Sequence, residues 1–269
     1  MTVLVLVLIG VLTGLTTVLF GFGGGFVTVP VIVWADAAVG PAAGTVAVAT
    51  SAIVMVVNAA VATTATPRVV LARLRGRGAL LGLLAAGGLL GALAAMAVPA
   101  DVPSWGFVIY VAVTIIDMLV RPGFLRPADL AQDDTSQRSI PTAAGAPIGA
   151  VASFLGVGGS VMTVPLLRRT GLPMGHATSL ANPLTLTISV PAALVFILAR
   201  QTTNLHGAVF TVGIVDLGAA ALLLIGAIPV IVILRRHPPR IPDRVHAWAY
   251  VVMLVVVLLT MAASLLQGT

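Results

Sequence analysis

The sequence predicts an all-α, polytopic integral membrane protein: a helix bundle made of two homologous repeats. The composition is the first reason, since 59% of the 269 residues are hydrophobic and only 8% are charged, whereas a soluble domain carries about 25% charged residues. The second reason is a series of apolar runs long enough to cross a bilayer. The third is a glycine-rich motif that occurs in both halves of the chain. This composition excludes a soluble enzyme, a nucleic-acid-binding protein and a disordered chain.

The apolar runs are expected to be transmembrane helices. A helix needs about 20 residues to cross the hydrocarbon core, because each residue adds about 1.5 Å and the core is about 30 Å thick. Backbone polar groups in lipid must also be satisfied within the segment, which a helix achieves. The segments that meet these requirements are Val3–Trp34, Gly44–Ala65, Ala79–Val98, Trp105–Val120, Pro141–Leu167, Ala177–Ala199, Ala208–Leu234 and Val245–Leu266.

The order of features in the first half of the chain returns in the second half. Residues 21–30 read GFGGGFVTVP and residues 156–165 read GVGGSVMTVP, so that six of ten positions are identical. A more polar stretch separates the two halves. We therefore expect a first membrane repeat over residues 1–120, a solvated inter-repeat linker over residues 121–139 and a second membrane repeat over residues 140–269.

The first segment of each half is expected to be broken at the repeated motif. Glycine costs roughly 1 kcal/mol per residue in a helix interior relative to alanine, so a cluster of three or four glycines must unwind the helix or allow very close packing. Gly21 and Pro30 bound the predicted helix break of the first half, and Gly156 and Pro165 bound that of the second. Each repeat should therefore open with a broken helix or a hairpin.

The arginines predict that the two repeats are inverted. Cytoplasmic loops of membrane proteins carry an excess of basic residues, and here the basic groups of the two halves follow different segments. All of them are cytoplasmic only if the fifth segment enters the membrane, turns at the glycines and returns; a single crossing would make the repeats parallel. The residues are Arg68, Arg73, Arg75 and Arg77 in the first half, and Arg168, Arg169, Arg235, Arg236, Arg240 and Arg244 in the second.

The glycine motifs also predict an anion-binding site. Unwound backbone exposes N–H groups, and a helix N-terminus carries about half a positive charge, so an anion can bind there without a charged side chain. Discontinuous helices at the membrane midplane serve this purpose in transporters built from repeats. The alternatives are helix packing through small residues and hydroxyl groups that bond the preceding helical turn. The candidate binding residues are Gly23, Gly24, Gly25, Thr28, Thr45, Gly158, Gly159, Ser160, Thr163, Thr178, Ser179 and Asn182.

Asp216 is the candidate for coupling transport to a second ion. It lies about eight residues inside the apolar run Ala208–Leu234, and an ionisable group inside the membrane is a functional candidate by default. We predict that it carries a coupling proton; a pair with an arginine, a helix cap or an interfacial position are the alternatives. Asp117 lies one turn before Arg121 and is predicted to form an interfacial ion pair with it.

These motifs together resemble the TauE/SafE sulfite exporter family. The resemblance rests on the two copies of Gly-x-Gly-Gly followed by proline, on Ala-Thr-Ser-Leu at residues 177–180 and on Gly-Ile-Val-Asp ending at Asp216. It covers nearly the whole chain and implies a polytopic transporter of sulfur-containing anions such as sulfite and organosulfonates. Ser160 replaces the last glycine of the second copy, and Thr45 lacks the serine that usually follows, which bears on the shape of the site.

The resulting functional hypothesis is a secondary transporter that moves a small anion across the plasma (inner) membrane by alternating access. The chain has no Gly-x4-Gly-Lys-Ser motif, so coupling to protons or to the membrane potential is expected rather than ATP. An enzyme is not expected, because neither a His-Glu-x-x-His nor a Gly-x-Ser-x-Gly motif occurs. A metal site is not expected, because the chain has no cysteine and only four scattered histidines. Neither a cofactor nor a nucleic-acid partner is expected. The partners are the small anion and the lipid bilayer, with no prediction of oligomeric state. An anion channel and a non-transporting assembly subunit are the alternatives.

Overall fold

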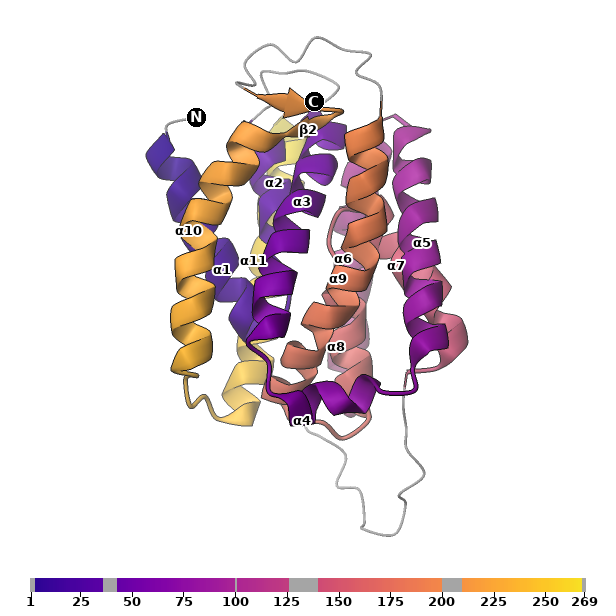
Figure 1. Ribbon diagram of the computed structural model, residues 1–269, viewed down its shortest axis with the longest axis vertical. Helices are drawn as coiled ribbons and strands as arrows, with labels where there is room; N and C mark the ends of the chain where they lie inside the picture. Colours follow the sequence, from indigo (N-terminus) through magenta and orange to yellow (C-terminus); the bar gives the residue numbers. More distant parts are fainter. Residues whose placement is uncertain (1–2, 36–42, 100, 126–139, 200–209, 268–269) are drawn as a thin grey trace.

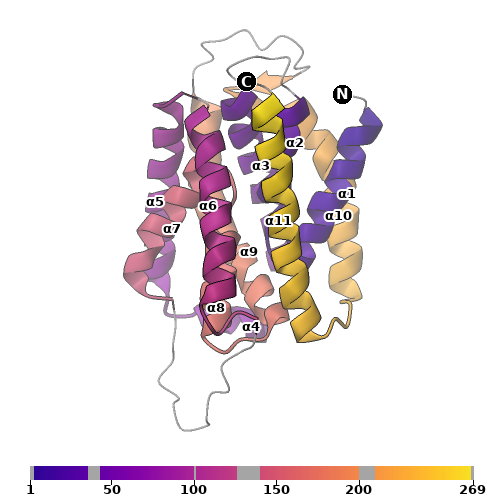
Figure 2. The ribbon, with the colours of Figure 1, turned by 180° about the vertical axis from the view of Figure 1, so that it is seen from behind.

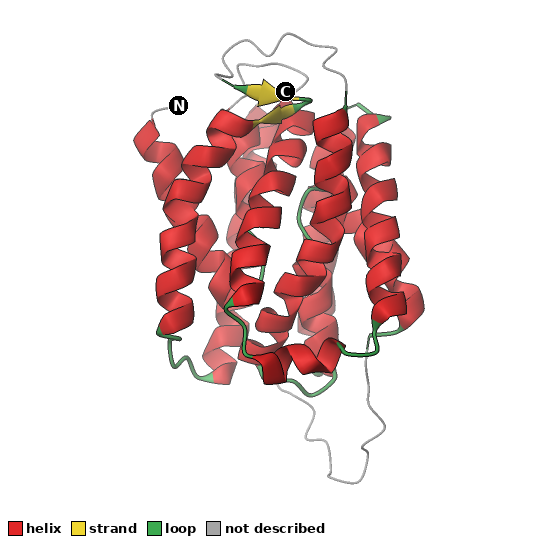
Figure 3. Cartoon of the chain, viewed as in Figure 1, coloured by secondary structure: helices red, strands yellow, loops and turns green. Residues whose placement is uncertain are grey.

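Long apolar helices dominate the computed structural model, which describes residues 3–35, 43–99, 101–125, 140–199 and 210–267 (Figure 1). Seven helices of the described residues are long and apolar enough to cross a membrane, which confirms an all-α polytopic membrane protein. They run nearly along one axis of the bundle (Figure 3). Their bounds are α1 Val3–Phe20, α3 Ala43–Thr64, α5 Gly78–Met96, α6 Asp101–Val120, α9 Met174–Leu198, α10 Leu217–Arg236 and α11 Asp243–Gln267.

Shorter elements fill the remainder of the described chain. The first and the fifth predicted segments are each divided into two helices at the glycine motif, as expected. Most of the predicted linker, residues 126–139, lies outside the described residues. The shorter elements are α2 Gly25–Ala35, α4 Arg68–Leu71, η2 Ala72–Leu74, η3 Thr142–Ala144, α7 Gly145–Phe154, α8 Ser160–Arg169, β1 Thr211–Val212 and β2 Val215–Asp216.

The bundle has two distinct ends. The α4 end is the lower end in Figure 1, and the β-hairpin end, with β1 and β2, is the upper end. Helix α1 begins at the β-hairpin end, and α2 returns to that end after the glycine motif (Figure 1). Helices α7 and α8 do the opposite, since α7 begins at the α4 end and α8 returns to it (Figure 2). The fifth predicted segment therefore enters and returns, as the arginines required.

Helices α3 and α9 form the centre of the bundle. In the most apolar 18-residue stretch of each helix, 67% of the residues of α3 and 56% of those of α9 are buried, against 28% for α10 and for α11. The outer helices keep large apolar side chains exposed, including Leu90, Ile109, Ile225 and Leu259. These residues lie on the surface that lipid covers, because a bilayer solvates apolar side chains as well as a protein core does.

Glycines bring the two halves of the chain into close contact. Helix α1 packs along α10, and α5 packs along α7. A Cβ built on Gly14 of α1 would lie 2.6 Å from the carbonyl oxygen of Ala227, and a Cβ on Gly145 of α7 would lie 2.9 Å from that of Leu80. Transmembrane helices associate through small residues in this way. Each half therefore holds the first helix of the other half against its own third long segment.

Glycine residues alone interrupt the helix in each of the two hairpins, and the two prolines do not. Gly21 and Gly156 adopt positive φ angles of 74° and 68°, a conformation that glycine tolerates and other residues rarely adopt. Pro30 and Pro165 were expected to take part in the break, but they lie inside α2 and α8. A proline removes only one backbone hydrogen bond from a helix, and membrane helices accept that loss where neighbours pack around it.

Asp216 lies at a helix start and not inside an apolar helix as expected. Residues 211–216 form a short antiparallel hairpin, in which Thr211 pairs with Asp216 and Gly213 has a positive φ of 61°. Helix α10 begins only at Leu217, and Asp216 is its N-cap, with the carboxylate accepting a hydrogen bond from the Ala219 amide at 2.9 Å. A turn residue within the apolar run ends the continuous helix that its hydropathy suggested, so the cap alternative describes this position.

Candidate functional site

The two glycine motifs meet at the middle of the bundle, between α3 and α9. A Cβ built on Gly23 would lie 2.9 Å from Thr185 Cγ2 and 3.6 Å from Met55 Cγ. A Cβ on Gly158 would lie 2.9 Å from Met55 Sδ and 3.0 Å from Thr185 Cγ2. Met55 and Thr185 stand near the midpoints of α3 and α9. The turns of both hairpins therefore converge half-way between the two ends of the bundle.

Glycine is required at these turns for two separate reasons. The first is conformation, because Gly23 and Gly24 have φ angles of +64° and +97°, which strain any residue with a Cβ. The second is space. A Cβ on Gly24 would lie 2.7 Å from Asn58 Nδ2, and a Cβ on Gly25 would lie 2.8 Å from the carbonyl oxygen of Gly156. The glycines thus unwind the chain and also let the two motifs approach each other closely.

Two helix N-termini face this meeting point. Helix α2 begins at Gly25 and runs to the β-hairpin end, while α8 begins at Ser160 and runs to the α4 end (Figures 1 and 2). The first N–H groups of a helix have no partner within the helix, and they carry about half a positive charge. The N-cap residue of α8, Gly159, supplies no side-chain cap. This arrangement favours a bound anion at the centre.

Fully buried polar side chains without a hydrogen-bond partner gather at the same place. An unpaired buried polar group costs about 1–3 kcal/mol, and a native protein holds only a few such groups per 100 residues. Neutral hydroxyl and amide groups of this kind can donate hydrogen bonds to the oxygens of a ligand. Among the described residues, the buried side chains next to the glycine turns with unpaired atoms are Asn58, Ser160, Thr163 and Thr185.

The predicted hydroxyl donors Thr28 and Thr178 are bound to their own helices. Thr28 Oγ1 donates to the Gly24 carbonyl at 2.8 Å, and Thr178 Oγ1 donates to the Gly175 carbonyl at 3.2 Å. Asn182 shares a face of α9 with Thr178, as their spacing predicts, because its Nδ2 donates to the Thr178 carbonyl at 3.2 Å. The Asn182 Oδ1 atom is buried without a partner within the described chain. The hydroxyl groups of Thr28 and Thr178 therefore bond the preceding helical turn, which was the alternative to ligand binding.

Ser179 and Thr45 lie apart from the meeting point of the glycine motifs. Ser179 is half-buried on α9, where its hydroxyl accepts a hydrogen bond from Arg235 Nη1 at 3.0 Å. Thr45 lies in the first turn of α3 and is half-buried. The α3 residues that lie next to the second glycine motif are Val48, Ser51 and Met55, further along the helix.

Ser51, a polar residue within an apolar segment of the sequence, joins α3 directly to the second motif. Its hydroxyl lies 3.1 Å from the Gly156 carbonyl oxygen and 2.8 Å from the Val48 carbonyl oxygen. The signal was present in the sequence, because Ala-Thr-Ser at residues 49–51 repeats Ala-Thr-Ser at residues 177–179.

Met55, Asn58 and Thr185 were not predicted as site residues. Asn58 is the sole amide of the second predicted segment, and a buried amide inside a membrane helix is a signal of function. Methionine and threonine are ordinary in such helices, so Met55 and Thr185 could be found only from the crossing of α3 and α9. Tyr250 of α11 completes the enclosure, since its hydroxyl donates to the Ser160 carbonyl at 3.2 Å.

A buried arginine closes the α4 end of the bundle beneath the site. Arg168, in the last turn of α8, is fully buried. Its Nε donates to the Phe124 carbonyl at 2.9 Å, its Nη1 donates to the Leu172 carbonyl at 3.0 Å, and its Nη2 pairs with the Asp243 carboxylate. The other oxygen of Asp243 accepts from the Met174 amide at 2.7 Å. Arg168 thus ties α8 to the start of α11, and Asp243 extends this contact to the start of α9.

A second ion-pair cluster lies next to it. Arg169 Nη2 lies 2.6 Å from Asp117 Oδ2, and Arg121 Nε lies 3.3 Å from Asp117 Oδ1. The predicted pair of Asp117 with Arg121 is therefore confirmed. Arg169 extends this pair from α6 to the end of α8, so that both arginines of the second hairpin are held at the α4 end.

Paired glycine-broken helices that converge inside a multi-pass helix bundle are an architecture of membrane transporters built from repeats. The chain belongs to the TauE/SafE sulfite exporter family: the family model described as "Sulfite exporter TauE/SafE" matches residues 6–261. This membership places the chain in the plasma (inner) membrane as a multi-pass protein. A search of curated proteins found no match, and neither did a search of solved structures.

Proposed function

We propose that the protein is a secondary transporter that moves a small, sulfur-containing oxyanion such as sulfite or an organosulfonate by alternating access. The observation that carries this proposal is the convergence of the two glycine turns with unpaired, fully buried polar groups at the middle of the bundle. The binding residues proposed from the sequence, Gly23–Gly25 and Gly158–Ser160, lie at that point, and Asn58 and Thr185 join them.

The chemistry of this place suits an oxyanion of modest charge. Backbone N–H groups, hydroxyl groups and an amide can each donate one hydrogen bond to a sulfonyl or sulfite oxygen, and the two helix N-termini supply positive potential. The side chains named at the meeting point are neutral. A neutral site holds an anion without the strong binding of a buried ion pair, and a transporter must release its substrate on the other side of the membrane.

The burial of the site supports alternating access. All residues from Gly21 to Pro30 are buried, and so are residues 156–161. The Arg168 contacts lie between this site and the α4 end, while the hairpin of β1 and β2 covers the opposite end, where the Asp216 amide donates to Thr50 Oγ1 at 3.1 Å. A substrate therefore reaches the centre only if one end opens, and alternating access opens the two ends in turn.

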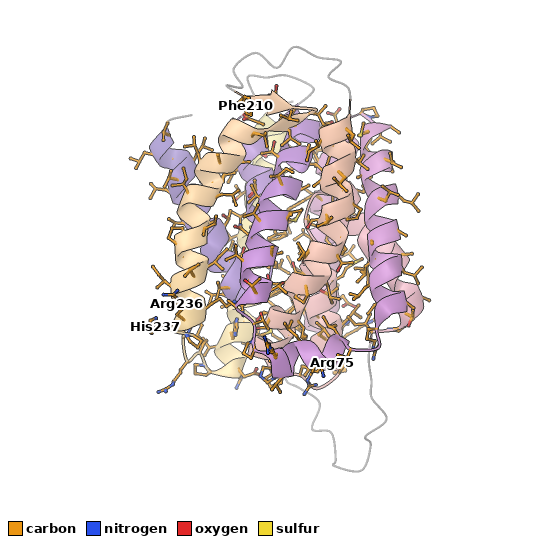
Figure 4. All side chains as sticks on the ribbon, in the orientation of Figure 1. Arg75, Phe210, Arg236 and His237 are labelled. Atoms are coloured by element: carbon orange, nitrogen blue, oxygen red, sulfur yellow. The ribbon has the colours of Figure 1, made fainter. Side chains whose placement is uncertain are left out.

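We also propose that residues 1–120 and residues 140–269 are inverted repeats joined by the linker 121–139. Two features support this: the first hairpin enters from the β-hairpin end and the second from the α4 end, and each packs on the third long segment of the other half (Figure 1). Arginines of both halves also gather at the α4 end, where Figure 4 shows Arg75 and Arg236. The α4 end is then cytoplasmic, by the positive-inside rule.

The inverted arrangement predicts the side of the membrane on which three arginines lie. Cysteines introduced singly at Arg75, Arg168 and Arg240 should be inaccessible to an impermeant maleimide in intact cells and should react after permeabilisation. The natural chain has no cysteine, so it serves as the unlabelled control. Periplasmic labelling at position 168 or position 240 would contradict the inverted repeats. Because Arg168 is buried, position 240 gives the cleaner signal.

The proposed function is tested by thermal stabilisation of the purified protein with a panel of anions. Sulfite, organosulfonates and thiosulfate should raise the melting temperature, and simple carboxylates should raise it less. Asn58→Leu, which keeps the side-chain volume but removes the amide, should abolish the effect. Flux into proteoliposomes that saturates and follows a counter-ion would support a transporter; unsaturable flux would indicate the channel alternative, and binding without flux the assembly subunit.

We propose Asp216 as the residue that carries the coupling proton, and asparagine separates this role from that of a helix cap. Asparagine caps helices about as well as aspartate does, so Asp216→Asn should leave the melting temperature unchanged while it abolishes proton-driven transport. Asp216→Ala is the control for the cap and should cost about 1 kcal/mol of stability. Normal proton-driven transport by Asp216→Asn would leave Asp216 as a cap alone.

A further inference from the structure

Arg235 carries hydrogen-bond donors that nothing in the described chain uses. It lies in the last turn of α10, and its Nη1 donates to Ser179 Oγ at 3.0 Å. Its Nε and Nη2 atoms are buried and have no hydrogen-bond partner among the described residues. A buried donor on a charged group that stays unpaired costs more than one on a neutral group. The two donors can therefore take an acceptor that the described residues do not supply.

The unpaired atoms are those that form the binding edge of a guanidinium group. The N–H groups of Nε and Nη2 point in parallel and match two oxygens of a carboxylate, sulfonate, sulfite or phosphate. Ser179 holds the third nitrogen and thereby fixes the plane of the group. A monatomic anion such as chloride cannot use both parallel donors in the same manner. The geometry therefore selects oxyanions.

Arg235 also lies between the α4 end and the first glycine turn. Its partner Ser179 comes directly after Thr178 in α9. The Thr178 carbonyl oxygen would lie 2.5 Å from a Cβ on Gly21. The guanidinium is thus bound to the residue of α9 that follows the one in contact with the first glycine motif. Arg236, the next residue, is exposed and stands at the outside of the bundle (Figure 4).

We propose that Arg235, oriented by Ser179, is a second oxyanion-binding site at the α4 end, distinct from the glycine turns. It receives an anion when the ends of α9 and α10 part and passes it to the centre. This proposal deepens the proposed transport function and rests on it for the direction of passage, but the binding site itself does not depend on it. The same oxyanion chemistry is present in sulfite, in a sulfonate and in the phosphate of a lipid headgroup.

The test is calorimetric titration of the full-length protein in neutral detergent with sulfite, ethanesulfonate and chloride. The wild type should bind two oxyanions, whereas Arg235→Lys, which keeps the charge but loses the parallel donors, should weaken one of the two sites by about tenfold or more. Ser179→Ala should weaken the same site, because the guanidinium is no longer held in its plane. Arg236→Lys is the matched control on the same helical turn and should bind as the wild type does.

A second arm distinguishes the source of the oxyanion. If a headgroup occupies the site, nanodiscs with phosphatidylglycerol should stabilise the wild type more than neutral nanodiscs do, and Arg235→Lys should lose that gain. Lower oxyanion affinity or loss of the lipid-dependent stabilisation in Arg235→Lys supports the proposal. Unchanged oxyanion affinity and lipid response in a folded Arg235→Lys variant would overturn it, as would equal affinity of the Arg235 site for chloride. A single site that depends on Arg235 but not on Gly24 would instead refute the central site and leave this inference standing.

Discussion

Gly24→Ala is expected to abolish anion binding at the glycine turns. Gly24 has a φ of +97°, and a left-handed conformation costs a residue with a Cβ about 1–2 kcal/mol. The new Cβ would also lie 2.7 Å from the Asn58 amide nitrogen, one of the unpaired groups that we assign to the ligand. Either the turn rewinds towards a helix, which removes its free N–H groups, or Asn58 is displaced. Both outcomes remove donors from the site.

Gly159→Ala examines the same site from the second motif. Its backbone already has a helical φ of −74°, so alanine brings no backbone strain there, but the Cβ would collide with the end of the Ile188 side chain. We expect anion binding to be abolished here as well, because the new Cβ would stand beside the free N–H groups at the start of α8. The measurement for both variants is ligand affinity by calorimetry, together with the melting temperature.

Gly76→Ala is the matched control for these variants. Gly76 has a positive φ of 76°, as Gly24 does, but nothing lies within 4 Å of the position where its Cβ would stand. It should therefore lose a similar amount of stability through backbone strain and keep its anion affinity. If Gly24→Ala also shows a lowered melting temperature with unaltered affinity, then the glycines serve packing and the anion binds elsewhere.

Arg168→Met is expected to cause a large loss of stability. Methionine retains much of the side-chain volume but removes every donor, and it leaves the carbonyl oxygens of Phe124 and Leu172 and the carboxylate of Asp243 without their partner. Breaking one side of a buried ion pair costs about 3–5 kcal/mol. The lower part of that range is expected here, because Asp243 is partly exposed. Melting temperature in detergent measures the effect.

Arg236→Met provides the comparison for Arg168→Met. Arg236 is exposed at the same end of the bundle (Figure 4), and exposed charges contribute little to stability. It should melt within the error of the wild type. An equal melting temperature for Arg168→Met would show that the α4 end is held by other contacts, and the closure that we assign to Arg168 would then need another explanation.

The membrane class, the helices and the broken hairpins could be predicted from local features. A low charge content and runs of about 20 apolar residues specify membrane helices, because lipid leaves the backbone no alternative partner. Gly21 and Gly156 mark the breaks for an equally local reason, since positive φ is a property of single residues. The return of the fifth segment followed from arginines, which report the side of the membrane and not any contact.

The candidate site could be predicted only in part. The glycines that form it are visible as a repeated motif, but the side chains that complete it come from two other helices. Asn58 and Thr185 become neighbours of the glycine turns only because α3 and α9 cross at their midpoints. Hydropathy also misplaced Asp216. An apolar strand has the same mean hydropathy as an apolar helix, so the average does not show where the hairpin ends and α10 begins.

The sequence by itself determined that this chain is a helical membrane transporter of the TauE/SafE family with two glycine-broken hairpins. Composition, segment length and backbone conformation depend on residues close together in the chain, so they are legible without a fold. Only the tertiary structure decided which hydroxyl groups bond their own helix, as Thr28 does, and which remain unpaired, as that of Thr163 does. It also decided that Arg168 has hydrogen-bond partners whereas two nitrogens of Arg235 have none among the described residues. Hydrogen-bond partners in a helix bundle come from residues far apart in sequence, and packing alone selects them.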